Sequence, residues 1–107
     1  MYAINGNDIT LTKGDSFYLN VNLTDAEGQP YEPQEGDVIT FTLKKSALED
    51  THIIQKTVPT DTMTLYLQPS ETKIAVGSYV YDIEINKQGD IYTFIPMSKF
   101  TITAEVG

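Results

Sequence analysis

Residues 77–85 read GSYVYDIEI, and the alternation of side chains in this stretch decides how the chain folds. Two tyrosines and two isoleucines share one face of an extended strand, whereas Val80, Asp82 and Glu84 share the other. Because charged side chains stay in contact with water, the face that carries Tyr79 and Tyr81 must point inward. The stretch therefore predicts a strand whose phenol rings lie between two layers.

The position of these tyrosines favours one kind of sandwich. In immunoglobulin-like domains, a tyrosine after a turn donates its hydroxyl to the backbone of the preceding corner, and Tyr79 follows Gly77 in this way. Tyr81 lies where antibody domains place their second cysteine, and its buried hydroxyl needs a partner. We expect Tyr79 to form such a tyrosine corner, with ordinary aromatic packing in the core as the alternative.

The same period-two alternation runs along the rest of the chain. It predicts strands at residues 9–11, 17–24, 39–43, 53–58, 63–67, 78–86, 91–95 and 100–104. Prolines at 59, 69 and 96 are expected to end three of them. Between strands, the sequence indicates a connecting loop at 31–36, a loop at 46–51 with a helical turn at 47–49 as an option, a helical turn at 69–73 and a hairpin turn at 87–90.

Seven or eight short strands with turn signals between them, and no stretch of helical period, indicate an all-β chain. This pattern is typical of an immunoglobulin-like antiparallel β-sandwich. A length of 107 residues suits one domain, so we assign residues 1–107 to a single sandwich.

Composition excludes several classes of function. The net charge is −8, from fifteen acidic residues against seven lysines, and only Lys44 and Lys45 are adjacent cations. Nucleic acids and anionic membranes are therefore not expected as partners. The chain has no cysteine, its first twelve residues do not resemble a signal peptide, and no apolar run approaches the roughly 20 residues of a membrane helix.

Residues for catalysis are hard to find. His52 is the single histidine, and a hydrolytic triad or zinc site needs an imidazole held by several partners. Asp82 and Glu84 lie roughly 7 Å apart on a wet strand face, a common spacing that does not imply a cleft. Phosphate-binding loops and nucleophile elbows are absent from the sequence. We expect a protein that is not an enzyme, with no catalytic residues and no cofactor.

An acidic segment raises the question of calcium. Its carboxylates are Asp25, Glu27, Glu32, Glu35 and Asp37. Calcium takes six to eight oxygen ligands, but this spacing does not match the helix–loop–helix pattern. A solvated acidic loop is the preferred interpretation, and no metal site is predicted.

Surface tyrosines and strand edges remain as possible contact points. Tyr18 and Tyr66 fall on faces opposite the apolar sets of their strands, and Tyr2, Tyr31 and Tyr92 are not assigned to either face. Tyrosine is enriched at protein contacts, although isolated exposed aromatic residues are ordinary. Strands near residues 9–12 and 98–106 are expected at sheet edges, where another chain could add a strand.

Several short motifs occur in a characteristic order. They are KGDSF at 13–17, LTDAEGQP at 23–30, GDVITFTLK at 36–44, LQPSET at 67–72, GSYVYDI at 77–83, GDIYT at 89–93 and FTI at 100–102. The series resembles small immunoglobulin-like proteins of phages and prophages of Gram-positive bacteria, and is similar to the N-terminal domain of the phage baseplate upper protein family. The resemblance spans residues 9–105.

The resemblance implies a structural or accessory role in a phage particle, exerted through protein–protein contacts in a tail, baseplate or other assembly. Other virion proteins or a second copy of the chain would be the partners, in the virion or in the bacterial cytoplasm during assembly. Family members continue into receptor-binding or trimerising parts, and no catalytic residues carry over. A carbohydrate-binding or cell-surface adhesion module is the alternative, which would need exposed tyrosines on one face with carboxylates nearby.

Overall fold

The structure is a computed structural model that describes residues 2–5 by their backbone and residues 7–21, 28–48 and 51–104 in full. Its elements are β1 (Tyr2–Asn5), β2 (Asp8–Thr12), β3 (Phe17–Asn20), β4 (Asp37–Lys44), β5 (Ile54–Val58), β6 (Thr64–Leu67), α1 (Pro69–Thr72), β7 (Gly77–Lys87) and β8 (Asp90–Thr103). The prediction of an all-β chain is confirmed, as is the short helical turn that begins at Pro69.

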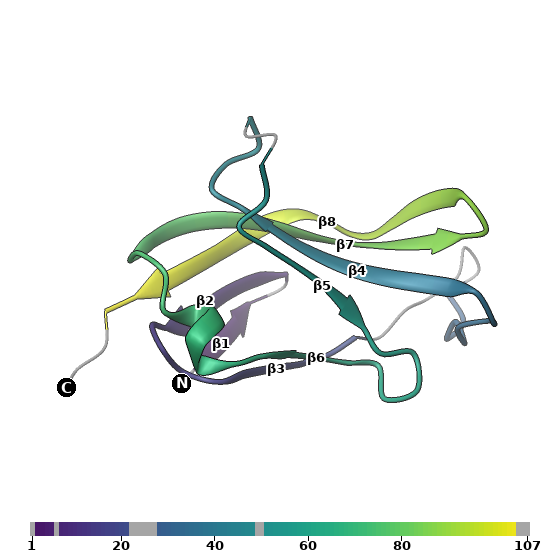
Figure 1. Cartoon of the computed structure of the whole chain (residues 1–107), viewed down its shortest axis with the longest axis horizontal. Coiled ribbons are helices and arrows are strands. Elements are labelled where there is room, and N and C mark those ends of the chain that lie inside the picture. Colours follow the sequence, from purple (N-terminus) through teal and green to yellow (C-terminus); the bar gives the residue numbers. More distant parts are fainter. Residues whose placement is uncertain (1, 6, 22–27, 49–50, 105–107) are drawn as a thin grey trace.

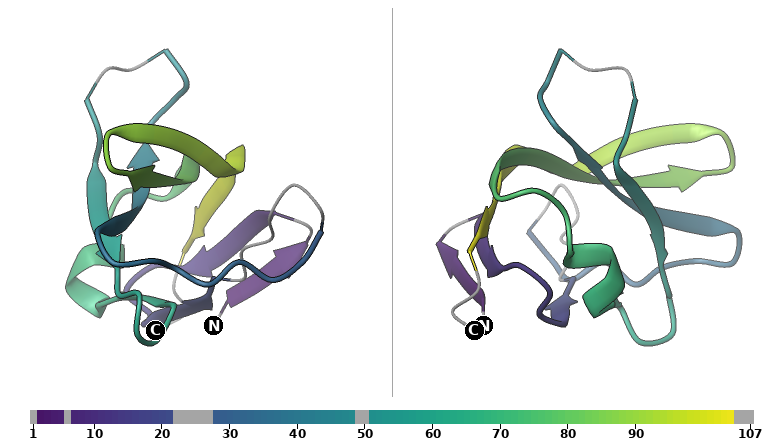
Figure 2. Two further views of the ribbon diagram at one scale, coloured as in Figure 1. Left: turned by 90° about the vertical axis from the view of Figure 1, so that its right-hand side faces the viewer. Right: turned by 60° about the vertical axis from the view of Figure 1, so that its left-hand side comes forward.

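The strands form two sheets of unequal size. The large sheet has the order β1-β2-β8-β7-β4-β5, and β3 pairs with β6 in a two-stranded sheet. Figure 1 shows the β3–β6 ribbon beneath β4, β7 and β8, and Figure 2 shows the large sheet curling so that β1 and β2 come round toward that ribbon. Neighbouring strands are antiparallel except β2 and β8, which run parallel.

The core lies between these layers and is aromatic at its centre. Phe100 contacts three rings, with centroid distances of 6.0 Å to Phe17, 6.2 Å to Phe41 and 6.0 Å to Tyr81. These rings come from β3, β4, β7 and β8, so one cluster joins both sheets. Edge-on and tilted ring contacts of this kind stabilise a core beyond the area that they bury.

Strand β7 confirms the prediction made from its alternation. Tyr79 and Tyr81 are only 4% and 3% exposed, while Asp82 and Glu84 lie on the half-exposed outer face. The Tyr79 hydroxyl donates to the carbonyl oxygen of Ala75 at 2.5 Å, which is the bond expected of a tyrosine corner. The phenol of Tyr79 thus ties the strand to the turn before it.

Tyr81 uses its hydroxyl in a longer connection. It donates to the carbonyl oxygen of Asn7, in the turn between β1 and β2. Burial, with a smaller effect from the charge of Asp8, raises the pKa of Tyr81 to about 12. The phenol therefore stays protonated as a donor, and it joins the centre of the sheet to the N-terminal hairpin.

The C-terminal part of the chain differs from the prediction. Pro96 does not end a strand at residue 95 as predicted. It lies within β8, which has 14 residues in all. The register with β7 shifts twice, between the partners of Tyr81 and Ile83 and again between those of Ile83 and Glu84. Proline is tolerated in a strand at such bulges, where no ladder hydrogen bond is required of its nitrogen.

The predicted edges of the large sheet are wrong for residues 9–12 and 100–102, whereas residues 98–99 do lie at an edge and residues 105–106 lie outside the described residues. Strand β2 lies between β1 and β8, and residues 100–102 of β8 pair with β2 on one side and with β7 on the other. The N-terminal segment folds back as β1, which the alternation did not predict, and covers the outer side of β2. The edges are instead β1, β5 and residues 90–99 of β8, which in the described part of the chain pair with β7 alone.

Two smaller differences concern local structure. Residues 47–48 form a turn rather than part of a helix, and Leu48 is 95% exposed there. Strand β3 ends at Asn20 rather than at residue 24, and the predicted positions 22–24 lie outside the described residues.

One ion pair closes the open side between the sheets. The register of β5 places Lys56 opposite Phe41, so its side chain projects from the inner face of the large sheet. Its ammonium donates to the carbonyl oxygen of Tyr66 in β6 at 2.8 Å and to the carboxylate of Glu71 in α1 at 2.9 Å. Lys56 therefore fastens the edge of one sheet to the edge of the other.

We predict that Tyr79→Phe lowers the free energy of unfolding by about 1 kcal/mol, because it removes one hydrogen bond and keeps the buried ring. Urea denaturation followed by circular dichroism measures the change. Tyr92→Phe is the matched control, since Tyr92 is 55% exposed. Equal loss in both variants would contradict the role given to the corner bond.

The Glu71 pair predicts a dependence of stability on pH. Partial burial raises the pKa of Glu71, but the hydrogen bonds from Gln68 and Lys56 outweigh it, and the net pKa lies below the ordinary value of 4.5. A carboxylate with a lowered folded pKa contributes stability above its unfolded pKa and loses it as the pH falls through the folded pKa.

We therefore expect the wild-type protein to lose more stability than Glu71→Gln between pH 6 and the acid transition, in urea titrations at several pH values. Glu32→Gln, which replaces an exposed carboxylate, should keep the wild-type profile. Parallel profiles for wild type and Glu71→Gln would show that this ion pair adds nothing measurable.

Candidate functional site

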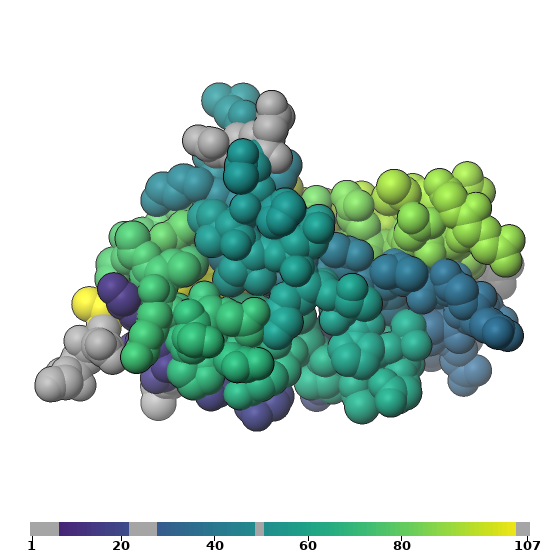
Figure 3. Space-filling model, viewed as in Figure 1, coloured from purple at the N-terminus to yellow at the C-terminus, as the bar shows by residue number. Residues whose placement is uncertain are grey.

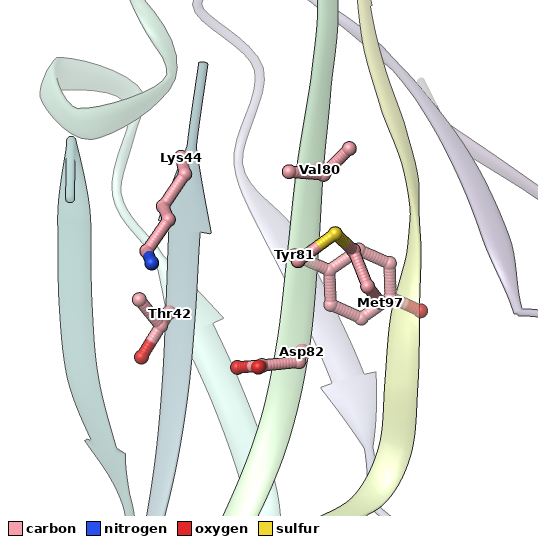
Figure 4. Close-up of a pocket in the computed structure, with 6 residues that line it drawn as sticks. All are labelled: Thr42, Lys44, Val80, Tyr81, Asp82 and Met97. Carbon is pink, nitrogen blue, oxygen red and sulfur yellow. The ribbon is translucent and has the colours of Figure 1, made fainter. Parts of the chain in front are cut away.

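The residues considered for catalysis do not converge. His52 is exposed in the segment before β5. Asp82 and Glu84 lie on the outer face of β7, as the alternation predicted. Figure 4 shows Asp82 beside Thr42 and Lys44 of the neighbouring strand, with Met97 on the other side.

The hollow around Asp82 is very small. Its volume is about 20 Å³, which is enough for one water molecule. Partial burial raises the pKa of Asp82, and the nearby ammonium of Lys44 opposes that change. The hollow is therefore too small to take a substrate, and a water molecule is the largest guest that it suits.

The acidic segment considered for calcium is only partly described. Asp25 and Glu27 lie outside the described residues. Within the described ranges, no group of three or more histidine, cysteine, aspartate or glutamate side chains is arranged to hold a metal ion. The carboxylate of Asp37 has a structural role instead. It accepts hydrogen bonds from the Tyr31 hydroxyl at 2.6 Å and from the Gln34 backbone at 2.8 Å.

The surface tyrosines separate into two groups. Tyr18 and Tyr66 are opposite each other in the β3–β6 register and stack with 4.6 Å between ring centroids. Their faces cover one another, which is the behaviour of a cross-strand pair that stabilises a narrow ribbon. Tyr31 is half-buried against Phe94, whereas Tyr92 is 55% exposed, and the side chain of Tyr2 is not among those described.

A groove lies at the far end of the molecule, between the loop before β4 and the β7–β8 turn. We call it the distal groove; its volume is about 300 Å³, and it is lined by Gln34, Glu35, Asp37, Lys87, Gln88, Asp90 and Tyr92. Figure 3 shows the blue start of β4 and the yellow-green hairpin side by side at this end. One exposed aromatic ring thus shares a groove with charged and amide side chains.

Both walls of the distal groove are tight turns. On one wall, the Asp37 backbone donates to Gln34 at 3.0 Å, while the Asp37 carboxylate accepts from the Gln34 backbone. On the other, Gln88 and Gly89 have φ angles of 55° and 99°, and the Gly89 backbone donates to the Asn86 side chain at 2.8 Å. Two positive φ angles in succession are typical of a type I′ hairpin turn.

Charges between the walls are linked through Tyr31. The ammonium of Lys87 lies 4.4 Å from the centroid of the Tyr31 ring. A hydrogen bond with the Tyr31 side chain raises the pKa of Lys87 against the opposing effect of burial, and the charges of Tyr31, Asp37 and Tyr92 add smaller effects. The hydrogen bond from Tyr31, then that from Gln34, lowers the pKa of Asp37. Lys87 and Asp37 are therefore both charged near neutral pH.

Apolar side chains are exposed on the opposite, outer face of the same end. Val38 is 44% exposed and Ile91 is 61% exposed. Val38 pairs with Asn86 from β4, and Ile91 pairs with Asn86 from β8. Met97, further along β8, is 48% exposed. Met97 lines the hollow at Asp82 and lies apart from these two residues. We call Val38 and Ile91, on either side of Asn86, the outer apolar patch.

The sequence alone did not reveal either surface. It predicted the loop at 31–36 and the turn at 87–90 separately, and no short-range signal placed them together. The pairing of Asp37 with Lys87 in the β4–β7 register brings them side by side. The one available signal was Gln88, which occupies a turn position where asparagine, aspartate or glycine is usual.

Comparison of the chain with protein-family models, with characterised proteins and with solved structures finds no match. In the part of the chain that the structure describes, no helix has the length and apolar character needed to cross a membrane. The site must therefore be interpreted from its own geometry.

We predict that Gln88→Gly raises the free energy of unfolding by about 0.5–1 kcal/mol, because glycine adopts a left-handed conformation without the steric cost of a side chain. Thermal and urea denaturation measure the gain. Gln55→Gly, within strand β5, is the matched control and should destabilise the protein. A loss of stability in Gln88→Gly would show that the Gln88 side chain contributes contacts worth more than the backbone cost.

Proposed function

We propose that this protein is a non-enzymatic, immunoglobulin-like module that binds another protein through the outer apolar patch. The exposure of Ile91 and Val38 on either side of Asn86, at the end of a hairpin that extends past the two-layered core, is the observation that carries the proposal. The centre of a protein interface is usually apolar, because apolar side chains have no polar group that must be desolvated when the partner binds.

Three features support the immunoglobulin-like topology. Strands β5, β4, β7 and β8 are neighbours in that order, opposite a β3–β6 pair. This agrees with the arrangement in which one sheet carries the C, F and G strands and the other carries B and E. The corner bond of Tyr79 occupies the position at which such domains have their tyrosine corner.

The shape of the patch favours contact through side chains rather than by strand addition. Residues 90–99 of β8 have an open edge within the described chain, but Pro96 and two register shifts interrupt it. Prolines and bulges are devices that keep edge strands from pairing with other chains. Ile91 and Val38 would therefore pack against the partner while the backbone edge stays unpaired.

Charge defines the chemistry of the partner. The chain carries a net charge of −8, which opposes close approach of a second copy and favours a partner with a basic surface. We propose a basic protein with an apolar centre to its contact surface. The setting in a phage or prophage virion rests on the resemblance of motif order to the phage baseplate upper protein family.

The experiment places a photo-crosslinking residue at Ile91 and, in a second protein, at Thr57 on the exposed part of β5. In lysate of the source organism after phage induction, we expect position 91 to give one defined crosslinked product, with a basic virion protein as its partner. An excess of wild-type protein should suppress the product, whereas Val38→Asp should not.

Outcomes that contradict the proposal are distinct from one another. Equal crosslinking from positions 91 and 57, or competition by Val38→Asp as strong as by wild type, would refute the patch as the contact surface. A partner that is not a virion protein would refute the phage setting and leave the patch in place.

A further inference from the structure

We propose that the distal groove binds a neutral saccharide, with one sugar ring stacked on Tyr92. The proposal goes beyond the protein contact, because the groove and the outer apolar patch use opposite faces of the β7–β8 hairpin. Tyr92 pairs with the inward-facing Ile85, whereas Ile91 pairs with the exposed Asn86.

The size of the groove agrees with a ligand of this class. A volume of about 300 Å³ lies at the lower end of the range found for small-molecule pockets, and it suits one or two sugar rings. The hollow at Asp82, at about 20 Å³, has no room for such a ligand. Of these two hollows, only the distal groove has the required space.

Tyr92 provides the aromatic surface. Its side chain is 55% exposed and lines the groove rather than packing into the core. The face of a phenol ring is electron-rich, and the C–H groups on the apolar face of a pyranose carry small positive charges. These two surfaces attract each other, and both leave water when they stack.

The polar lining matches hydroxyl groups. Glu35, Asp90 and Gln88 line the groove, and among the described residues no hydrogen-bond partner is found for their side chains. Carboxylates accept two hydrogen bonds or more, and a carboxamide both donates and accepts, so neighbouring sugar hydroxyls find complementary groups. Gln34 adds a second carboxamide to the lining.

The balance of charge argues against anionic ligands. Three carboxylates face one ammonium in the groove, so phosphates, sulfates and acidic sugars are repelled. A basic ligand would meet the ammonium of Lys87, which lines the groove and pairs with Asp37 in the β4–β7 register, and it could not use the exposed ring of Tyr92 and the two carboxamides as fully as a polyhydroxyl ligand does. A neutral ligand with many hydroxyl groups fits these constraints best.

The walls are held in place before any ligand arrives. Asp37 joins its own turn to Tyr31, and the opposite turn is closed by the bond from Gly89 to Asn86. A sugar hydroxyl that bonds to the protein gives up a hydrogen bond to water, so each bond adds little affinity. Affinity for a sugar therefore depends on protein side chains that are already held in the binding geometry. The backbone of Gln88 is left-handed, and the turn holds its side chain at the groove. A left-handed conformation at a residue other than glycine lowers stability.

The test is a titration of isotopically labelled protein, followed by amide chemical shifts, with maltotriose, cellotriose and triacetylchitotriose at up to about 10 mM. We expect at least one of them to shift residues 34–37 and 87–92 selectively. Tyr92→Ala should weaken that binding at least about tenfold, whereas Tyr92→Phe should retain it.

Two matched controls separate the groove from other surfaces. Tyr18→Ala removes an aromatic ring from the β3–β6 face and should leave binding unchanged. Ile91→Asp disrupts the outer apolar patch and should also leave the sugar titration unchanged, so failure of the protein contact and failure of the saccharide site can be told apart.

Several results would overturn the proposal. One is the absence of groove shifts with all three sugars. Another is binding that survives in Tyr92→Ala. A third concerns a parallel titration with hexalysine. If hexalysine shifts the groove residues and the sugars do not, the groove is a site for basic peptides.

Discussion

The structure depends on the burial of two phenol rings with their hydroxyl groups satisfied. Tyr79 and Tyr81 fill the inner face of β7, and each hydroxyl donates to a backbone carbonyl outside that strand. A buried hydroxyl without a partner would be costly, so the fold can accept these rings only where the chain supplies acceptors. The turn before β7 and the turn between β1 and β2 are held in place by this requirement.

The two ends of the structure differ in how they are held together, and the Tyr79 bond lies at the better-connected end. There, Thr72 is buried and donates to the carbonyl oxygen of Asp15, so α1 is joined to the turn between β2 and β3. At the side of the sandwich, Lys56 joins both sheets and α1. The far end has the β7–β8 turn and the loop before β4, whose side chains line the distal groove.

This difference between the ends bears on function. A rigid core permits one hairpin to extend past it and to present different chemistry on its two faces, with Ile91 on the outer face and Tyr92 on the inner. An apolar contact surface and a polar groove can then coexist within a few residues. In the proposed roles, the net negative charge would favour a basic partner at the first surface and would repel acidic ligands at the second.

The sequence by itself determined which side chains are buried. Period-two alternation correctly predicted the inward face of β7 and most of the strands, because burial of alternate residues is a local property of an extended chain. The proline at 69 and the polar residues after it correctly predicted the short helical turn. It also predicted that Tyr18 and Tyr66 lie outside the core. The stack that they form was not predicted, because it depends on the register of β3 with β6.

Only the tertiary structure decided which strands are neighbours. Alternation is blind to the identity of the adjacent strand, so the parallel pairing of β2 with β8, the return of β1 and the inward direction of Lys56 were not foreseen. From the local sequence, Pro96 predicts the end of a strand, but the irregular pairing with β7 allows β8 to continue past it. The distal groove arises for the same reason, since the pairing of Asp37 with Lys87 joins turns that are 50 positions apart in the chain.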